Sequence, residues 1–126
     1  MEEKNRFSIG ARIKSSNHAW RGVGILIKSS HNAWMAIFVS LLAVYLGFIL
    51  NISETEWLFL IFSIFLVFIV EAFNTAIEID MNLTSPEYHP YARDTKDVAA
   101  GAVFLSTILS IIVALFIFLP KILYLL

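Results

Sequence analysis

Two glutamates and an asparagine share one face of a predicted helix near the middle of the chain. Glu71, Asn74 and Glu78 are spaced i, i+3 and i+7, so they lie within roughly 60° of one another at ~3.6 residues per turn. They follow fourteen uncharged residues, 57–70. Ionisable groups in a membrane-spanning helix are costly and mark a functional site by default. A helix that ends near Val70 is the alternative, but the apolar AFNTAI segment between the two acids favours function.

The two carboxylates are expected at different depths in the membrane. If the helix enters the bilayer at Trp57, Glu71 lies about 21 Å along it, and Glu78 lies about 10.5 Å further on. Glu71 would then meet a lipid hydroxyl, and Glu78 a water-soluble cosubstrate at the membrane boundary. These depths predict that Glu71 accepts a proton from an alcohol.

A second group of candidate residues precedes the last apolar run. Lys96 is suited to hold a phosphate as a point charge. Asp97 beside it can pair with the lysine or bind Mg²⁺, which prefers oxygen ligands. A charged helix boundary is the plainer interpretation of this pair. His89 is either a nucleotide contact or an ordinary loop histidine.

Three apolar runs must position these groups: residues 33–50, 57–80 and 98–119. Each is long enough to cross the ~30 Å hydrocarbon core as a helix. The chain has 126 residues, of which 59% are hydrophobic and 15% are charged, which excludes an ordinary soluble domain. We therefore predict an all-α membrane protein with one domain, residues 1–126.

Proline and polar residues mark the ends of the last two spans. Pro86 and Pro90 are expected to stop the second spanning helix within the loop 81–97. Asp94 or Thr95 is expected to cap the third.

Charge asymmetry sets the expected orientation. Six of the nine basic residues precede the first span, and the loop 51–56 has two acids and no base. The positive-inside rule then places the N-terminus and the loop 81–97 in the cytoplasm, with only Lys121 in mild disagreement.

Residues 1–30 are predicted to hold an amphipathic helix at the membrane surface. The basic residues that repeat every seven positions are Lys14, Arg21 and Lys28, and His18 lies near their face of the helix. The neighbouring apolar stripe consists of Trp20, Val23 and Ile27. Such a helix binds the interface through aromatic burial and attraction to anionic lipid. An ordinary juxtamembrane anchor explains the same charges equally well.

Several other classes of chemistry are excluded. The chain has no cysteine, so a thiol nucleophile is impossible. It has no GxxxxGK[ST] loop, no glycine-rich kinase loop and no HExxH motif. We expect no nucleic-acid partner.

Two motifs carry a resemblance to a known family. EAFNTAIE at 71–78, followed by EYHPYARDTKDVAAGAV at 87–103, resembles the small prokaryotic diacylglycerol kinases, which include the undecaprenol kinases of Gram-positive bacteria. The resemblance covers nearly the whole chain. It implies ATP- and Mg²⁺-dependent phosphorylation of a lipid hydroxyl by a homotrimer in the bacterial inner membrane.

The resemblance also implies roles for individual residues. Glu71 corresponds to the proton acceptor, Glu78 to the ligand of metal and nucleotide, and Asn74 to a supporting residue of the same motif. The expected ATP contacts, besides Glu78, are His18, Glu87, Tyr88, His89, Lys96 and Asp97.

Ser30 departs from the family pattern. Many members carry at this position a glutamate that shares the metal with the acid corresponding to Glu78. A serine hydroxyl is a much weaker Mg²⁺ ligand than a carboxylate. Either His31, Asn32 or a water substitutes for it, or the affinity for the metal is lower, or the protein is impaired. Asn82 likewise stands where the motif has a later aspartate.

Two other functions stay open. One is a catalytically impaired relative or non-enzymatic helix bundle, and the other is a small proton-coupled transporter. A transporter needs an acid near mid-membrane, whereas every acid here lies near the end of a span. The choice between diacylglycerol and undecaprenol also stays open.

Overall fold

The computed structural model describes residues 7–126, which form four helices. These are α1 (Ile9–Ser29), α2 (His31–Ile49), α3 (Glu54–Thr84) and α4 (Pro90–Leu125). The last three helices are long and apolar enough to cross a membrane. Positions 1–6 of the predicted surface segment lie outside the described residues. The predicted all-helical class with three apolar helices is thus confirmed.

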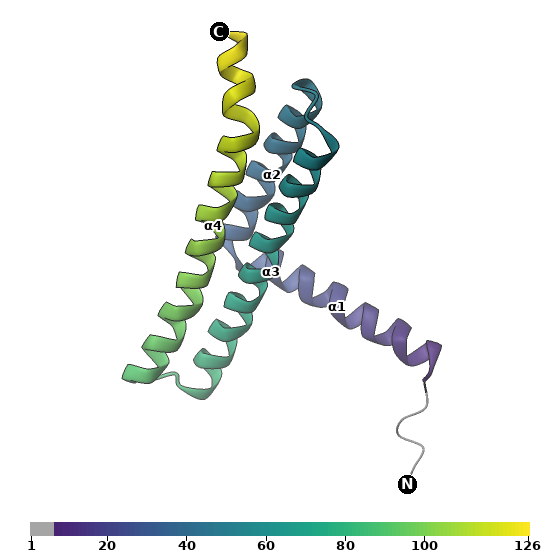
Figure 1. Ribbon diagram of the computed structural model, residues 1–126. Helices are drawn as coiled ribbons and strands as arrows, with labels where there is room; N and C mark the ends of the chain where they lie inside the picture. Colours follow the sequence, from purple (N-terminus) through teal and green to yellow (C-terminus); the bar gives the residue numbers. More distant parts are fainter. Residues whose placement is uncertain (1–6) are drawn as a thin grey trace.

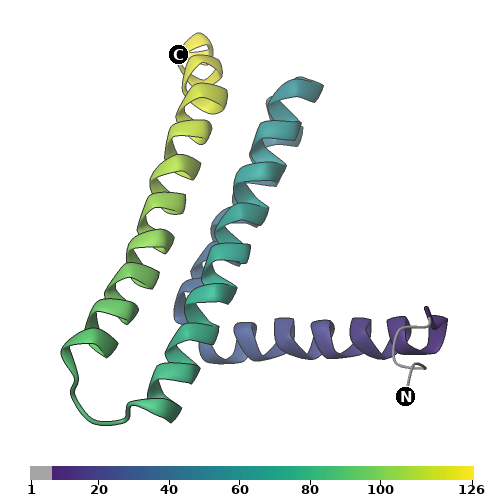
Figure 2. The same cartoon turned by 60° about the horizontal axis from the view of Figure 1, so that its bottom comes forward.

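The first helix projects away from the bundle that the other three form (Figures 1 and 2). Ser8 caps its start by accepting a hydrogen bond from the backbone N–H of Ala11. At its end the chain becomes extended at Ser30, with φ −114° and ψ 118°. This single residue separates α1 from α2, so the direction of the chain changes abruptly there.

The turn between α2 and α3 is tight and has two local causes. Asn51 has φ 49°, a left-handed conformation that asparagine tolerates better than most residues. Ser53 and Glu56 then form a capping box at the start of α3, which satisfies two backbone N–H groups that a helix start leaves free. Close packing follows, because Gly47 of α2 lies directly against the ring of Trp57.

The main packing interface joins α3 and α4, which run antiparallel (Figure 2). A buried apolar cluster lies toward the C-terminus of α4 and consists of Leu60 of α3, Ile117 and Phe118 of α4, and Ile52 of the turn between α2 and α3. At the same end, Lys121 Nζ forms an ion pair of 3.0 Å with Glu56 Oε1. The lysine that disagreed with the positive-inside pattern is therefore neutralised by an acid of the neighbouring helix.

Both α3 and α4 extend well beyond the hydrocarbon thickness. Their 31 and 36 residues correspond to about 46 and 54 Å of helix, against ~30 Å of hydrocarbon. The capping residue of α4 is His89, with Pro90 at the first helical position. The expectation that Asp94 or Thr95 caps this helix was wrong, because a proline at the first turn starts a helix readily.

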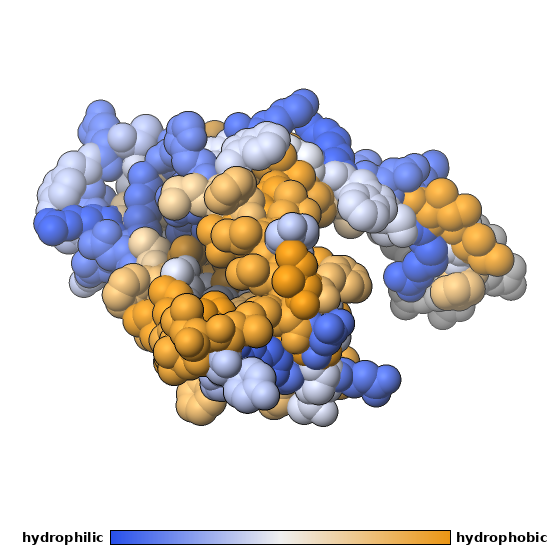
Figure 3. Space-filling model, turned by 90° about the horizontal axis from the view of Figure 1, so that it is seen from above, coloured by the Kyte–Doolittle hydropathy of each residue, from blue (hydrophilic) through white to orange (hydrophobic). Residues whose placement is uncertain are grey.

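Apolar side chains cover much of the bundle surface seen from the C-terminal end, while α1 carries both apolar and polar side chains (Figure 3). Exposed examples include Phe62 and Phe116 on the spanning helices and Trp20 on α1. Such a surface needs lipid or further protein to cover it.

Candidate functional site

Glu71 is buried where the junction of α1 and α2 meets α3. Its side chain is only 2% exposed, and its Oε1 accepts a hydrogen bond of 2.9 Å from the Ser30 hydroxyl. A buried carboxylate is costly unless it is hydrogen-bonded. The structure therefore places Ser30 beside Glu71, the predicted proton acceptor. The resemblance, which treats the position of Ser30 as that of a metal ligand, did not predict this contact.

A groove of about 470 Å³ runs from Glu71 between α2, α3 and α4. Glu71, Asn32 and Ala100 line one end, and Leu60 is among the residues at the other. From Glu71 to Leu60 the groove covers about 16.5 Å of α3, roughly half of the ~30 Å hydrocarbon core. Most of the remaining lining is aliphatic or small. The groove thus has the shape and polarity to hold a hydrocarbon chain with its polar end at Glu71.

Asn74 and Glu78 form the next part of the site along α3. Asn74 is 8% exposed, and its Nδ2 donates to Glu78 Oε1 at 3.5 Å. Its Oδ1 is buried without a hydrogen-bond partner among the described residues. Glu78 is exposed. Together they present an unpaired amide oxygen about one helical turn beyond Glu71 and a carboxylate about two turns beyond it.

Asn82 extends this line and brings in Lys96 from α4. The Lys96 Nζ donates a 2.7 Å hydrogen bond to Asn82 Oδ1. Asn82 is eleven positions after Glu71, so its direction differs from that of Glu71 by only about 20°. We call Glu71, Asn74, Glu78 and Asn82 the polar stripe. It spans about 16.5 Å of α3, with Ser30 bound at one end and Lys96 at the other.

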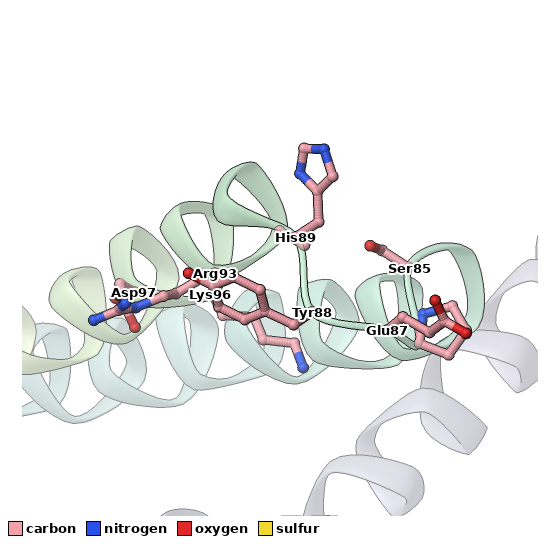
Figure 4. Close-up of a pocket in the computed structure, with 9 residues that line it drawn as sticks. Ser85, Glu87, Tyr88, His89, Arg93, Lys96 and Asp97 are labelled. Carbon is pink, nitrogen blue, oxygen red and sulfur yellow. Dashed lines mark ion pairs between the residues drawn. The ribbon is translucent and has the colours of Figure 1, made fainter.

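The loop between α3 and α4 frames a pocket of about 240 Å³ (Figure 4). Its lining includes the predicted residues Glu87, Tyr88, Lys96 and Asp97. Tyr88 extends along α4 toward Lys96 in Figure 4. Arg93 also lines the pocket and lies 3.8 Å from Asp97. The pocket therefore combines two cations with a phenol and two carboxylates.

The interpretation of Lys96 and Asp97 as residues at a helix boundary is wrong. Because α4 begins at Pro90, they lie near the end of its second turn, beyond the reach of the helix dipole. Asn82 holds the lysine instead. Lys96 can therefore attract a phosphate only through its own charge.

Within residues 7–126, neither predicted histidine, His18 or His89, forms a hydrogen bond or ion pair with the other predicted ATP contacts. His89 Nδ1 accepts a hydrogen bond of 3.1 Å from the backbone N–H of Tyr91, and its ring points away from Lys96 (Figure 4). His89 also lines the loop pocket, but it has a capping role of its own. His18 is exposed on α1, and within residues 7–126 it forms no hydrogen bond or ion pair with the other candidates.

The polar stripe can hold Mg²⁺ only if substrate phosphates and water supply the rest of the ligands around the ion. Within residues 7–126, no group of three or more His, Asp or Glu side chains is placed to hold a metal ion. Mg²⁺ usually keeps several waters and uses one or two carboxylates plus phosphates. Glu78 and the unpaired Asn74 Oδ1 match that modest requirement. His31 and Asn32, the suggested substitutes for a missing carboxylate, are exposed at the start of α2.

Two functional candidates were missed in the sequence. Arg93 could have been found from its i, i+4 spacing to Asp97, had the helix been predicted to begin at Pro90. The contact between Asn82 and Lys96 had no sequence signal, because it depends on how the loop folds α4 back onto α3.

Comparisons with known proteins agree with these features. Residues 17–118 match the family described as "Prokaryotic diacylglycerol kinase". An undecaprenol kinase of Bacillus subtilis (strain 168) is 36% identical over 119 residues, covering 94% of this chain and 93% of that protein. A diacylglycerol kinase of Escherichia coli (strain K12) is 32% identical over 100 residues, covering 79% and 82%. A diacylglycerol kinase of Synechocystis is 31% identical over 122 residues, covering 95% and 70%. The buried glutamate, the apolar groove and the three apolar helices thus belong to a bacterial membrane protein of the prokaryotic diacylglycerol kinase family, a family of lipid kinases.

Proposed function

We propose that the protein transfers the γ-phosphoryl group of ATP, with Mg²⁺, to the hydroxyl of a membrane lipid at the cytoplasmic face. The observation that carries this proposal is the apolar groove that ends at the buried Glu71. A lipid in the groove would present its hydroxyl to the carboxylate. The exposed Glu78 and the loop pocket lie toward the end of α3 and the start of α4, where a water-soluble nucleotide has access.

In this reaction Glu71 takes the proton of the lipid hydroxyl. The lipid oxygen then forms a bond to the γ-phosphorus while the bond from that phosphorus to the bridging oxygen of ADP breaks. Lys96 and Arg93 hold phosphate oxygens, and Glu78 with Asn74 would hold Mg²⁺. When bound, the ion neutralises phosphate charge. Phosphoryl transfer depends mainly on such positioning and neutralisation.

The lipid is either undecaprenol or diacylglycerol. The relative from Bacillus subtilis is named an undecaprenol kinase and matches almost the full length of both chains, which favours the polyprenol. The groove itself presents mostly small and aliphatic side chains. It therefore makes few demands on a lipid beyond an apolar tail and a terminal hydroxyl.

The test is transfer of labelled phosphate from Mg-ATP to each lipid by the purified protein. We expect turnover with at least one lipid, and a fall of roughly 10²- to 10⁴-fold for Glu71→Gln, because a general base is lost. Glu54→Gln, an exposed acid at the start of α3, is the matched control and should retain activity. No turnover by the folded wild-type protein on either lipid would instead support a catalytically impaired relative.

The proposal includes the orientation and assembly of the chain. The basic N-terminal segment and the loop between α3 and α4 face the cytoplasm, and α1 lies along that membrane surface. Three chains assemble, and they cover part of the exposed apolar surface of the spanning helices. Native mass spectrometry in detergent should give three times the 14.3 kDa chain mass. Only monomers under conditions that preserve activity would contradict the trimer.

A further inference from the structure

We infer that Ser30 is a positioning residue that fixes one oxygen of Glu71, so that the other oxygen faces the lipid hydroxyl. The inference rests on the proposed function, since it assigns Ser30 a part in the same reaction. It differs from the expected role of this position as a metal ligand.

Ser30 is held by three hydrogen bonds at the junction of α1 and α2. Its backbone N–H donates to Leu26 O over 3.1 Å, which closes the end of α1. Its Oγ accepts from the backbone N–H of Ala33 at 3.2 Å and so caps the start of α2. The same Oγ donates its single proton to Glu71 Oε1 at 2.9 Å. A serine hydroxyl has only one proton to donate, so this arrangement commits it to Glu71.

Glu71 has no other hydrogen-bond donor in the described chain. Ser30 is the only group among residues 7–126 that donates to its carboxylate, and only Oε1 receives that bond. The last torsion of a glutamate side chain has no sharp preferred value. Without Ser30, no hydrogen bond from residues 7–126 would fix the plane of the carboxylate. With Ser30, Oε1 is fixed to a helix start and Oε2 is left for another partner.

The position of Glu71 indicates which partner that is. Glu71 lines the end of the apolar groove, next to Asn32 of α2 and Ala100 of α4. A hydroxyl that enters with a lipid tail in the groove meets the carboxylate there. A general base must lie within hydrogen-bond reach of the proton that it takes, and a misplacement of about 1 Å can cost roughly 10²-fold in rate.

The experiment compares Ser30→Ala with two variants that separate the hydroxyl from the helix cap. Ser30→Thr keeps both. Ser30→Gly keeps an accepted capping residue but removes the hydroxyl, and it replaces the alanine variant should that fail to fold. Ser53→Ala is the matched control, because Ser53 also caps a helix through a 3.2 Å bond to a backbone N–H and has no side-chain contact with Glu71. For each variant, kcat and the KM for ATP and lipid are measured beside thermal unfolding in detergent.

We expect Ser30→Ala and Ser30→Gly to lower kcat roughly 10- to 100-fold while the KM for ATP stays unchanged. Ser30→Thr should retain most of kcat, and Ser53→Ala should keep kcat while losing thermal stability. If the role of Ser30 were purely structural, Ser30→Ala would behave like Ser53→Ala, keeping kcat and losing only thermal stability. That result overturns the inference. Full kcat in Ser30→Gly overturns it as well.

Ser30→Glu tests the metal-ligand alternative directly. If Ser30 serves Glu71, a second carboxylate there repels the first and kcat falls. A variant that keeps kcat and needs less Mg²⁺ would assign the position to the metal and overturn the inference. The activity of the wild-type protein distinguishes the two proposals. An inactive wild type contradicts the proposed function. An active wild type whose Ser30 variants keep full kcat contradicts only the positioning role.

Discussion

Lys96 Nζ on α4 lies 2.7 Å from Asn82 Oδ1 on α3. This bond closes the hairpin that the loop 85–89 forms, and it aligns the lysine with the polar stripe of α3. Asn82 is one turn beyond Glu78, about 6 Å along the axis. The cation is therefore held near the carboxylate that the proposed function assigns to metal and nucleotide, although 14 positions separate Lys96 from Asn82 in sequence.

Replacing Lys96 by methionine should weaken ATP binding and leave lipid binding intact. A hydrogen bond to a charged group contributes about 1.5–3 kcal/mol, so the KM for ATP should rise roughly 10- to 100-fold. Steady-state kinetics with varied ATP and with varied lipid measure the two effects separately. Lys121→Met, which removes a lysine at the opposite end of α4, is the control and should leave both KM values unchanged. An equal rise of the two KM values would contradict the assignment.

The ion pair between Lys121 and Glu56 should contribute modestly to stability. Its atoms are 3.0 Å apart, with side-chain exposures of 29% and 25%, and exposed pairs are worth about 0.2–1 kcal/mol. Glu56→Gln removes the charge but preserves the capping box, because glutamine serves at that position too. A double-mutant cycle with Lys121→Met, measured by unfolding in detergent, should give a coupling energy in that range that falls with added salt. Strict additivity would show that the pair contributes nothing.

Gly47→Ala should destabilise the hairpin of α2 and α3. A Cβ at this position would lie 2.7 Å from Cη2 of Trp57 and 3.1 Å from Cδ1 of Ile52. Overpacking of this kind costs about 1–3 kcal/mol. Gly101→Ala is the control, because a Cβ there meets nothing within 4 Å. Thermal unfolding in one detergent compares the two, and Trp57→Phe should partly rescue Gly47→Ala by shortening the ring that it meets.

The turn at Asn51 should reject β-branched residues. Its φ of 49° costs an L-residue with a Cβ roughly 1–2 kcal/mol, whereas glycine adopts it freely. Asn51→Gly is therefore expected to match the wild type in thermal stability, and Asn51→Val to unfold at a lower temperature. Equal stability of the two variants would mean that the turn changes its conformation to suit the residue.

The sequence predicted the spanning segments well because uncharged runs report directly on the hydrocarbon core. It predicted helix ends poorly for the same reason. The run 98–119 omits the first two turns of α4, since Arg93 and Lys96 are polar although they are helical. Hydropathy locates the membrane, whereas His89 and Pro90 locate the start of the helix.

The site was predictable along one helix but not between helices. Helical periodicity alone brings Glu71, Asn74 and Glu78 to one face. It says nothing of which residue on that face meets the α1–α2 junction, and the structure gives that contact to Glu71 rather than Glu78. The contact between Lys96 and Asn82 was out of reach in the same way, because it joins two helices through a loop.

The unbroken helix α3 fixes the distances between the residues of the polar stripe. Seven residues separate Glu71 from Glu78, which is two turns to within about 20°, so both the spacing and the direction of the two carboxylates are fixed by a count of residues. One inserted residue would turn Glu78 by about 100° and would carry Asn82 away from Lys96, whereas an insertion of seven would restore the direction but add about 10.5 Å. Substitutions elsewhere on α3 leave this spacing unchanged, whereas almost no insertion or deletion between residues 71 and 82 preserves it.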